Sequence, residues 1–330
     1  MMMNHSMKSQ FNVRSGTVIE GKWHNNRYVI LKELGYGANG VVYLSKFNNQ
    51  QVAIKMSDNG MSITSEVNVL KSFAKVQGSA LGPSLLDVDD WAVNGKNISF
   101  YVMEYIHGPD LLSFIQQKGP SWTAVLILQL LNDLAKLHDS GWVFGDLKPE
   151  NLIVTGPPSK VRCIDVGGTT MQGRAIKEFT EFYDRGYWNL GTRKAEPGYD
   201  LFAAAMIMIN TVYPNRFTKK TGGIAELKEK VQTSKELIQY EEVILNALMG
   251  KYLSAKEMRH ALLESMNRSD APRASSRVNR KSPPPVSGGS TVTRTQQNVR
   301  KRKNGGFFET ACIVAVISCL YFLYIYGQLI

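Results

Sequence analysis

A stretch in the middle of the chain, Phe144–Asn151, constrains this sequence more than any other feature. It reads F-G-D-L-K-P-E-N, so that a carboxylate (Asp146), a cation (Lys148) and an amide (Asn151) follow one another. Phosphoryl transfer uses all three groups: a carboxylate accepts the proton of the attacking hydroxyl, a cation neutralises the transferred group, and an amide oxygen ligates a metal ion. The spacing predicts Asp146, Lys148 and Asn151 as catalytic residues, with Asn151 also a ligand of Mg²⁺.

A second carboxylate follows at a fixed distance. Asp165-Val166-Gly167 begins fourteen residues after Asn151, behind Val161–Ile164, whose mostly apolar residues predict a strand. An aspartate at the end of this strand can ligate a Mg²⁺ ion that bridges the phosphates of a nucleotide. Asp165 is therefore the second predicted metal ligand and a predicted nucleotide-binding residue.

A glycine-rich stretch in the N-terminal part of the chain predicts a site for phosphates. The pattern G-x-G-x-x-G-x-V is met by Gly35, Gly37, Gly40 and Val42, and dinucleotide-binding folds use nearly the same glycines. Those folds continue into a helix, whereas Val41–Leu44 is β-branched and aromatic and predicts a strand. The glycines are therefore expected at the tip of a hairpin, where backbone N–H groups can approach phosphates. On this motif alone, a glycine-rich turn without a ligand stays open.

The next predicted strand supplies a lysine. Val52-Ala53-Ile54-Lys55 matches V-A-I-K, and Lys55 is expected to contact the α- and β-phosphates of ATP. Glu66, inside the predicted helix Ser62–Ala74, is the expected partner that holds Lys55 extended. We count Lys55 and Glu66 as catalytic residues, and Ala53 as part of the nucleotide site.

Strand-like segments come first along the chain and helical segments later. The predicted strands are Tyr28–Tyr36, Gly40–Lys46, Gln51–Met56 and Ile98–Tyr105. The later predicted helices are Leu111–Gln117, Trp122–Asp139, Asp200–Val212 and much of Glu236–Met266. This order predicts an α+β, two-lobed fold, with a β-rich N-terminal lobe and a helical C-terminal lobe. We expect an N-terminal extension over 1–26 and a domain over 27–264, divided into lobes at 27–104 and 105–264.

The last twenty residues differ in kind from the rest. Ala311–Ile330 carries no charge, and twenty residues at ~1.5 Å per residue span about 30 Å, the thickness of a bilayer's hydrocarbon core. Arg300–Lys303 lies just before this stretch, so the positive-inside rule places that flank in the cytoplasm. We expect a single-pass anchor over 307–330 in the cell membrane, with the N-terminal domain in the cytoplasm. A buried terminal helix is the alternative.

A basic linker is expected over 265–306, because this segment is rich in Ser, Pro and Gly and carries ten Lys or Arg against Asp270. Three interpretations of its charge stay open: a topology determinant and tether, attraction to anionic lipids, or non-specific binding to DNA phosphates, aided by Arg216, Lys219 and Lys220. The linker residues expected to contact lipid or DNA are Arg273, Arg277, Arg280, Lys281, Arg300, Lys301, Arg302 and Lys303.

In order and spacing, these motifs resemble Hanks-type (eukaryotic-like) serine/threonine protein kinases over Arg27–Leu263. The succession of domain, basic linker and terminal anchor resembles the membrane-anchored, YabT-like kinases of spore-forming Bacillus. The resemblance implies ATP and Mg²⁺ in the cleft between two lobes, and Ser or Thr acceptors on protein substrates. It also implies that Met103 is the gatekeeper, that Glu104–Ile106 is the hinge beside the nucleotide, and that Asp200 braces the catalytic loop.

The sequence departs from that family in its catalytic loop. Gly145 replaces the arginine of H-R-D, which in the family neutralises charge near a phosphorylated activation loop. We therefore expect activity not to require this phosphorylation, although Thr169, Thr170 and Thr180 are candidate phosphosites. Thr180 also matches the threonine of the family's G-T-x-x-Y segment, which implies a role beside the substrate. Binding of the linker to DNA or lipid would concentrate the chains and favour trans-autophosphorylation in a homodimer.

Two further departures concern packing and substrate binding. Phe144 replaces the histidine of H-R-D and Val166 replaces the phenylalanine of D-F-G, so that the packed volume is roughly preserved. Asp184–Trp188 replaces A-P-E. The surface that binds the substrate is therefore expected to be atypical.

Two other classes of protein stay open. One is a small-molecule phosphotransferase of the aminoglycoside type, and Lys148-Pro149 argues against it because that class usually lacks this pair. The other is a membrane-tethered pseudokinase scaffold without catalysis. Decayed kinases usually lose at least one catalytic residue, whereas this chain keeps all of those predicted above.

Overall fold

The computed structural model describes residues 13–37, 40–75, 81–220 and 222–270. The chain divides into one unit over Met1–Arg273 and another over Ala274–Ile330. The second unit lies outside the described residues, and with it the predicted anchor and nearly all of the predicted linker. Among the described residues, no helix is long and apolar enough to cross a membrane.

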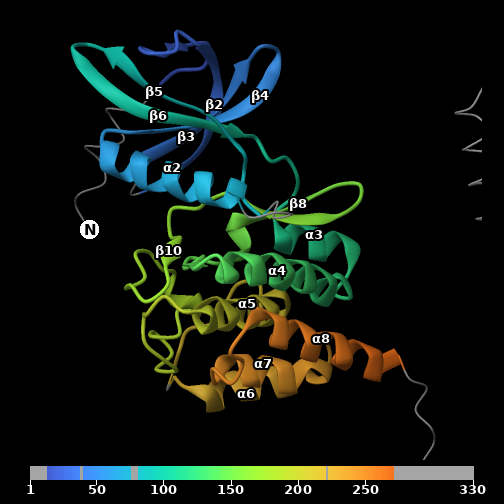
Figure 1. Cartoon of the computed structure of the whole chain (residues 1–330). Coiled ribbons are helices and arrows are strands. Elements are labelled where there is room, and N and C mark those ends of the chain that lie inside the picture. The colour runs from blue at the N-terminus through green and yellow to red at the C-terminus, as the bar shows by residue number, and fades with distance from the viewer. Residues whose placement is uncertain (1–12, 38–39, 76–80, 221, 271–330) are drawn as a thin grey trace, which may run out of the picture. The chain divides into compact units, whose positions relative to one another are not determined.

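The N-terminal lobe is built on one antiparallel sheet of six strands (Figure 1). The strands are β1 (Val18–Glu20), β2 (Arg27–Gly37), β3 (Gly40–Phe47), β4 (Gln50–Ser57), β5 (Leu85–Val93) and β6 (Lys96–Glu104). Their order across the sheet is β1-β2-β3-β4-β6-β5. Tyr28, Ile30, Val41 and Tyr43 are buried at alternate positions of β2 and β3, because one face of the sheet packs on an apolar core.

Two of these strands, β1 and β5, were not predicted from the sequence. β1 pairs with β2 and lies ahead of the predicted start of the domain at Arg27. β5 contains Asp87 and Asp89, and aspartate is uncommon in strands. The Tyr28 hydroxyl donates a 2.6 Å hydrogen bond to Asp87, and the backbone N–H of Trp23 donates one of 2.9 Å to Asp89. These carboxylates therefore tie β5 to β2 and to the segment before it.

The helix α2 (Gly60–Lys75) packs against this sheet (Figure 1). Its buried side chains include Ile63, Val67 and Leu70, which share one helical face. Glu66 lies on the same buried face, where a carboxylate is costly unless it is paired. The placement of Glu66 is therefore explained by its partners in the site below.

The C-terminal lobe is helical and packs around α5. Its helices are α3 (Leu111–Lys118), α4 (Trp122–Asp139), α5 (Pro197–Val212), α6 (Ile224–Gln232), α7 (Glu241–Leu248) and α8 (Ala255–Asp270). Every residue of α5 from Tyr199 to Asn210 is buried, which explains its nearly continuous apolar sequence. α8 continues to Asp270, beyond the predicted end of the domain at 264. The predicted two-lobed α+β fold is confirmed for the described residues.

Short strands and turns hold the loops of the C-terminal lobe that carry the predicted site residues. β8 (Leu152–Thr155) pairs with β9 (Lys160–Cys163), and β7 (Trp142–Val143) pairs with β10 (Thr170–Met171). The 3-10 turns are η1 (Pro149–Asn151), η2 (Glu181–Tyr183) and η3 (Ile238–Tyr240). The catalytic stretch lies between β7 and β8, and Asp165 follows β9. The pairing of β7 with β10 and of β8 with β9 therefore brings the catalytic stretch close to Asp165.

Candidate active site

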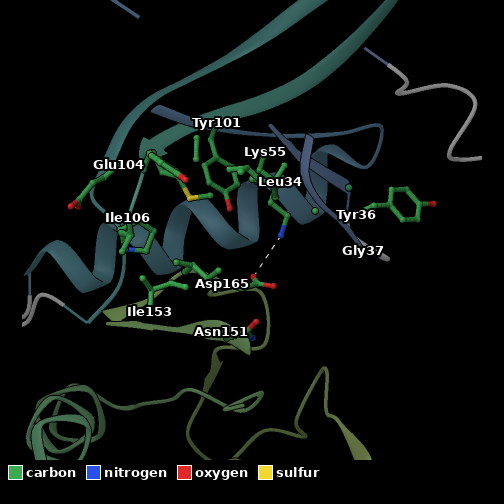
Figure 2. A pocket seen from close by; sticks show the side chains of 18 of the residues that line it. Leu34, Tyr36, Gly37, Lys55, Tyr101, Glu104, Ile106, Asn151, Ile153 and Asp165 are labelled. Carbon is green, nitrogen blue, oxygen red and sulfur yellow. Dashed lines mark ion pairs between the residues drawn. The ribbon is translucent and has the colours of Figure 1, made fainter. Parts of the chain in front are cut away.

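A cavity of about 380 Å³ lies where the sheet meets the C-terminal lobe (Figure 2). Its walls are apolar toward the end of β6, where Leu34, Met103 and Ile153 line it, and charged around Lys55 and Asp165. The ten residues predicted to bind the nucleotide all line this cavity: Gly35, Gly37, Gly40, Val42, Ala53, Lys55, Met103, Glu104, Ile106 and Asp165. Asn151 lines it as well.

Lys55 lies among carboxylates. Its amine is 2.6 Å from Glu66 Oε2 and 3.8 Å from Asp165 Oδ1, the second contact being drawn in Figure 2. β4 carries the lysine and α2 carries Glu66, so the helix packing described above creates the pair. Burial alone would lower the pKa of the Lys55 amine, but the carboxylates of Asp165, Glu66 and Glu178 raise it above its ordinary value. The lysine is therefore charged at neutral pH.

Tyr101 on β6 is a residue of this site that the sequence analysis missed. Its hydroxyl donates a 2.8 Å hydrogen bond to Glu66 Oε2, the same oxygen that contacts Lys55. Burial raises the pKa of the Tyr101 hydroxyl well above its ordinary range, and the Glu66 charge raises it further, so the hydroxyl keeps its proton. A tyrosine in a predicted strand is usually read as core, and no sequence signal distinguishes this one.

The three catalytic residues predicted from one stretch form one cluster. The Asp146 carboxylate is ion-paired with the Lys148 amine through Oδ2 and accepts a 3.0 Å hydrogen bond from the Thr180 hydroxyl through Oδ1. The Lys148 amine also donates to Thr180 Oγ1 at 3.3 Å. The side-chain N–H of Asn151 donates a 3.3 Å hydrogen bond to the backbone carbonyl of Asp146. The amide oxygen of Asn151 is left for a metal ion. Thr180 is thus placed beside the group that would accept the substrate's proton.

Asp200, near the start of α5, holds the catalytic loop through its backbone. Its fully buried carboxylate accepts hydrogen bonds from the backbone N–H groups of Phe144 (2.7 Å) and Gly145 (2.9 Å). The ring Nε2 of His138, at the end of α4, is 2.9 Å from the same carboxylate. One side chain therefore joins two helices to the loop that carries Asp146.

The geometry at Gly145 explains why no arginine is present there. Gly145 has a φ of +88°, in the left-handed region that favours glycine. A Cβ atom at this position would lie 2.6 Å from the backbone carbonyl oxygen of Gly168. The loop after Asp165 therefore approaches Gly145 too closely for any side chain.

We expect a Gly145→Arg variant to be less stable and less active than the wild type. A left-handed conformation costs a non-glycine residue roughly 1–2 kcal/mol of unfolding free energy, and displacement of Gly168 adds to this. Gly141 is a matched control, because it has a φ of +85° and, chain neighbours aside, no described residue comes within 4 Å of a Cβ built there. In thermal melts, Gly145→Ala should lower Tm more than Gly141→Ala does. Equal shifts for the two alanine variants would contradict this account.

The side chain of the predicted hinge residue Glu104 points away from the cavity (Figure 2). Its carboxylate is paired with the Arg162 guanidinium on β9, with Arg162 Nη2 2.9 Å from Oε2. The hydrogen bond from Arg162 holds the pKa of Glu104 below its ordinary value. Arg162 also donates to the backbone carbonyl of Gly82 at 2.6 Å. Glu104 can therefore contact a nucleotide only through its backbone, while its side chain ties the two lobes together.

Two of the three candidate phosphosites are inaccessible in this structure. Thr169 and Thr170 are buried, at 0% and 1% exposure, next to Gly168. The Thr170 hydroxyl donates to the Gly168 carbonyl at 2.9 Å. Neither side chain is exposed in this conformation, and their assignment as phosphosites stays a prediction. Thr180 is partly exposed, and its hydroxyl is engaged by the catalytic cluster.

The segment that replaces A-P-E is held by its own polar contacts. The fully buried Asp184 accepts hydrogen bonds from the Gly186 N–H and the Tyr199 hydroxyl, both 3.0 Å, and from Arg193 Nε at 2.8 Å. Arg185 is ion-paired with Glu196 at 2.7 Å, directly ahead of α5. Asp184, Arg185 and their partners therefore hold this part of the C-terminal lobe, where the family has A-P-E.

Thr180 also lines a second cavity, of about 500 Å³. Phe182, Tyr187 and Phe217 form its aromatic walls. Arg216, also in its lining, is ion-paired with Glu150 of the catalytic stretch. The cavity therefore adjoins the catalytic cluster.

Comparison with known proteins agrees with this geometry. The protein kinase domain family matches residues 28–277. The chain therefore belongs to the protein kinase family.

The relatives point to one class of kinase. The chain is 49% identical over 335 residues to serine/threonine-protein kinase YabT of Bacillus subtilis, with 98% of each chain covered. It is 26% identical over 263 residues to a probable serine/threonine-protein kinase of Clostridium perfringens, covering 72% of this chain and 38% of that one. The predicted enzyme class, a serine/threonine protein kinase, and the resemblance to YabT-like kinases are confirmed. Kinases of this family use ATP and divalent metal ions.

Proposed function

We propose that this chain transfers the γ-phosphoryl group of ATP, with Mg²⁺, to serine or threonine hydroxyls of proteins at the cytoplasmic face of the cell membrane. The contact between Thr180 and the Asp146–Lys148 pair is the main support for the proposal. It shows that a hydroxyl group can lie against this carboxylate and this cation, as the acceptor hydroxyl of a substrate must. The charged end of the nucleotide cavity shares Asn151 with this cluster.

The residues of the cavity fit a metal-bound nucleotide. Among the described residues, none apart from the chain neighbours comes within 4 Å of a Cβ built at Gly35 or Gly37, so this part of the hairpin backbone leaves room for a ligand. Asn151 and the half-exposed Asp165 offer oxygen ligands, which Mg²⁺ prefers. When bound, Mg²⁺ neutralises negative charge that develops on the phosphates.

The side chains of the protein supply the other functions that phosphoryl transfer needs. Lys55 binds the phosphates, and Glu66 keeps its amine in the cavity. Asp146 accepts the proton of the attacking hydroxyl, and Lys148 neutralises charge on the transferred group. The bond from Thr180 orients the Asp146 carboxylate, and the second cavity receives residues that flank the acceptor. ADP and a phosphorylated hydroxyl are the products.

Transfer of labelled γ-phosphate tests the proposal. Full-length chain is incubated with labelled ATP, Mg²⁺ and either a generic protein, kanamycin or no acceptor, and Asp146→Ala serves as the inactive control. We expect label on protein serine and threonine in the wild type only. Label on kanamycin alone would favour the aminoglycoside-type phosphotransferase, and no label with the wild type would favour a scaffold.

The removal of the Thr180 hydroxyl tests its orienting role. A hydrogen bond to a charged group contributes about 1.5–3 kcal/mol, so Thr180→Val should lower kcat roughly 10- to 100-fold with little change in the KM for ATP. Thr180→Ser keeps the hydroxyl and should retain most of the rate. Phosphatase treatment of the wild type is the control, because it should leave the rate unchanged. A loss of rate after that treatment would show Thr180 or another residue to be a required phosphosite instead.

The location and regulation of the kinase are further parts of the proposal. The uncharged stretch Ala311–Ile330 and the basic flank Arg300–Lys303 support a tail anchor with the kinase domain in the cytoplasm. The charge of the linker supports its attraction to anionic lipid or DNA, which would promote trans-autophosphorylation between two copies. A salt-titrated DNA-binding assay separates these cases, because lack of binding at low salt would remove the DNA interpretation.

A further inference from the structure

A cation lies over each aromatic wall of the second cavity. Cations within about 6 Å of a ring centre are attracted by the face of the ring. The distances from cation to ring centre are 5.9 Å for Arg216 over Phe182, 4.8 Å for Lys219 over Tyr187 and 5.2 Å for Lys230 over Phe217. Each of these rings therefore already holds a positive charge, and a basic side chain that entered the cavity would meet like charges.

Arg216 also neutralises a carboxylate of the catalytic stretch. Glu150 lies between Lys148 and Asn151 in the sequence, and its side chain is 55% exposed. Among the described residues, Arg216 is the one residue that is ion-paired with Glu150. A basic side chain of a substrate that approaches the catalytic cluster could therefore bind Glu150 only by displacing Arg216.

The charges around the cavity favour neutral or acidic side chains. Among the described residues that line it, Arg216 is the one cation and Glu181 the one carboxylate. Lys219 and Lys230 lie over two of the rings and add two positive charges. Glu150 is compensated by its pairing with Arg216. Cations therefore outnumber the carboxylates that remain for a substrate.

The backbone at Arg216 is unfavourable for an arginine. Its φ of +57° lies in the left-handed region, which glycine and asparagine adopt more readily. Its N–H donates a 2.9 Å hydrogen bond to the carbonyl oxygen of Tyr213, which fixes this turn. Residues held in such conformations cluster at ligand sites. The contacts of the Arg216 side chain, rather than its backbone, therefore explain this residue type.

We propose that Arg216 prevents the kinase from recognising a basic residue beside the acceptor hydroxyl, so that its substrates are neutral or acidic there. The guanidinium occupies Glu150, and the cations over the rings repel a positively charged side chain in the cavity. Thr180 lines the cavity and is bonded to Asp146, so a residue in the cavity lies close in sequence to the acceptor. This inference rests on the proposed transfer to protein hydroxyls, and it makes Arg216 a specificity-determining residue.

Phosphorylation of peptides by the full-length chain tests this role. Each peptide contains a single serine in a background of alanine and glycine, with Lys, Gln or Glu at one position close to the serine. The kcat/KM of each variant, at saturating ATP and Mg²⁺, is divided by its own value for the Gln peptide, so that a general loss of activity cancels. In the wild type, Lys should lower kcat/KM at the position that reaches the cavity, and Glu should not. In Arg216→Gln the Lys-to-Gln ratio should rise about fivefold, the most that an exposed ion pair contributes, because Glu150 is then free to bind the lysine.

Further variants serve as controls in the same assay. Arg216→Lys keeps the charge and should keep the wild-type ratio. Arg216→Gln combined with Glu150→Gln should return the ratio to within about twofold of the wild type, because the carboxylate that would bind the lysine is gone. Lys220→Gln removes a nearby cation that does not line the cavity, and should leave the ratio unchanged. If thermal melts show Arg216→Gln to be unfolded, Arg216→Asn takes its place, because asparagine suits the left-handed backbone.

The outcomes separate this inference from the proposed function. A ratio for Arg216→Gln within about twofold of the wild type would overturn the inference. An equal rise in the double variant would also overturn it, because Arg216 would then act by repulsion alone. So would a wild-type preference for Lys at the position that Arg216→Gln affects, because Glu150 would then be accessible despite its pairing. Failure of the wild type to label any peptide or a generic protein would instead contradict the proposed function.

Discussion

An Asp200→Ala variant should lose most of its stability margin and nearly all of its activity. Asp200 is fully buried and is bonded to Phe144, Gly145 and His138, so its removal leaves two backbone N–H groups without an acceptor. Breaking a buried charged cluster by removing one partner costs about 3–5 kcal/mol of unfolding free energy. At roughly 2–4 °C per kcal/mol for a domain of this size, Tm should fall by about 10 °C.

A surface aspartate gives the matched control. Asp139 forms an exposed ion pair with Lys256, at 63% and 68% side-chain exposure, and exposed pairs contribute only about 0–1 kcal/mol. Asp139→Ala should therefore leave Tm within a few degrees of the wild type and leave phosphoryl transfer unchanged. The account would be wrong if Asp200→Ala matched Asp139→Ala in both measurements.

The core elements of the fold were predictable because their patterns are local. The strand-forming residues of β2 to β4 and the helical spacing of apolar residues in α2 are properties of neighbouring residues alone. β5 could not be predicted, because Asp87 and Asp89 are explained only by their contacts with Tyr28 and Trp23 across the sheet. The end of α8 at Asp270 was likewise missed, because polar residues on its last turn resemble a linker.

Site residues could be predicted from the sequence where the residue type and its spacing within a motif define its chemical role. Lys55 was paired with Glu66 from the sequence, and Asp146 and Lys148 were assigned separate roles in one reaction; the structure places each of the two pairs in contact. The direction of the Glu104 side chain depends on Arg162, fifty-eight residues away, so no local pattern contains it.

The residues missed at the site share one property, which is that only the packing of distant segments defines them. Tyr101 reaches Glu66 from a neighbouring strand. Glu178 reaches the cavity because its segment is held at Lys177 and Thr180. Thr169 and Thr170 are buried directly after Gly168, whose carbonyl oxygen lies close to Gly145.

The central claim is that Asp146 is the base for phosphoryl transfer to a protein hydroxyl. In Asp146→Asn the side chain keeps its size but can no longer accept a proton from the substrate. General-base catalysis contributes roughly 10²- to 10⁴-fold, so kcat should fall about a thousandfold. Nucleotide binding should be retained, because Asp146 does not line the nucleotide cavity.

The most direct measurement compares the rate of label transfer to protein serine and threonine by the wild type and by Asp146→Asn, at saturating ATP and Mg²⁺, with nucleotide affinity measured on the same samples. The account predicts about a thousandfold loss of rate with affinity within about threefold of the wild type. A variant that kept more than about a tenth of the wild-type rate would contradict the assignment of Asp146 as the base.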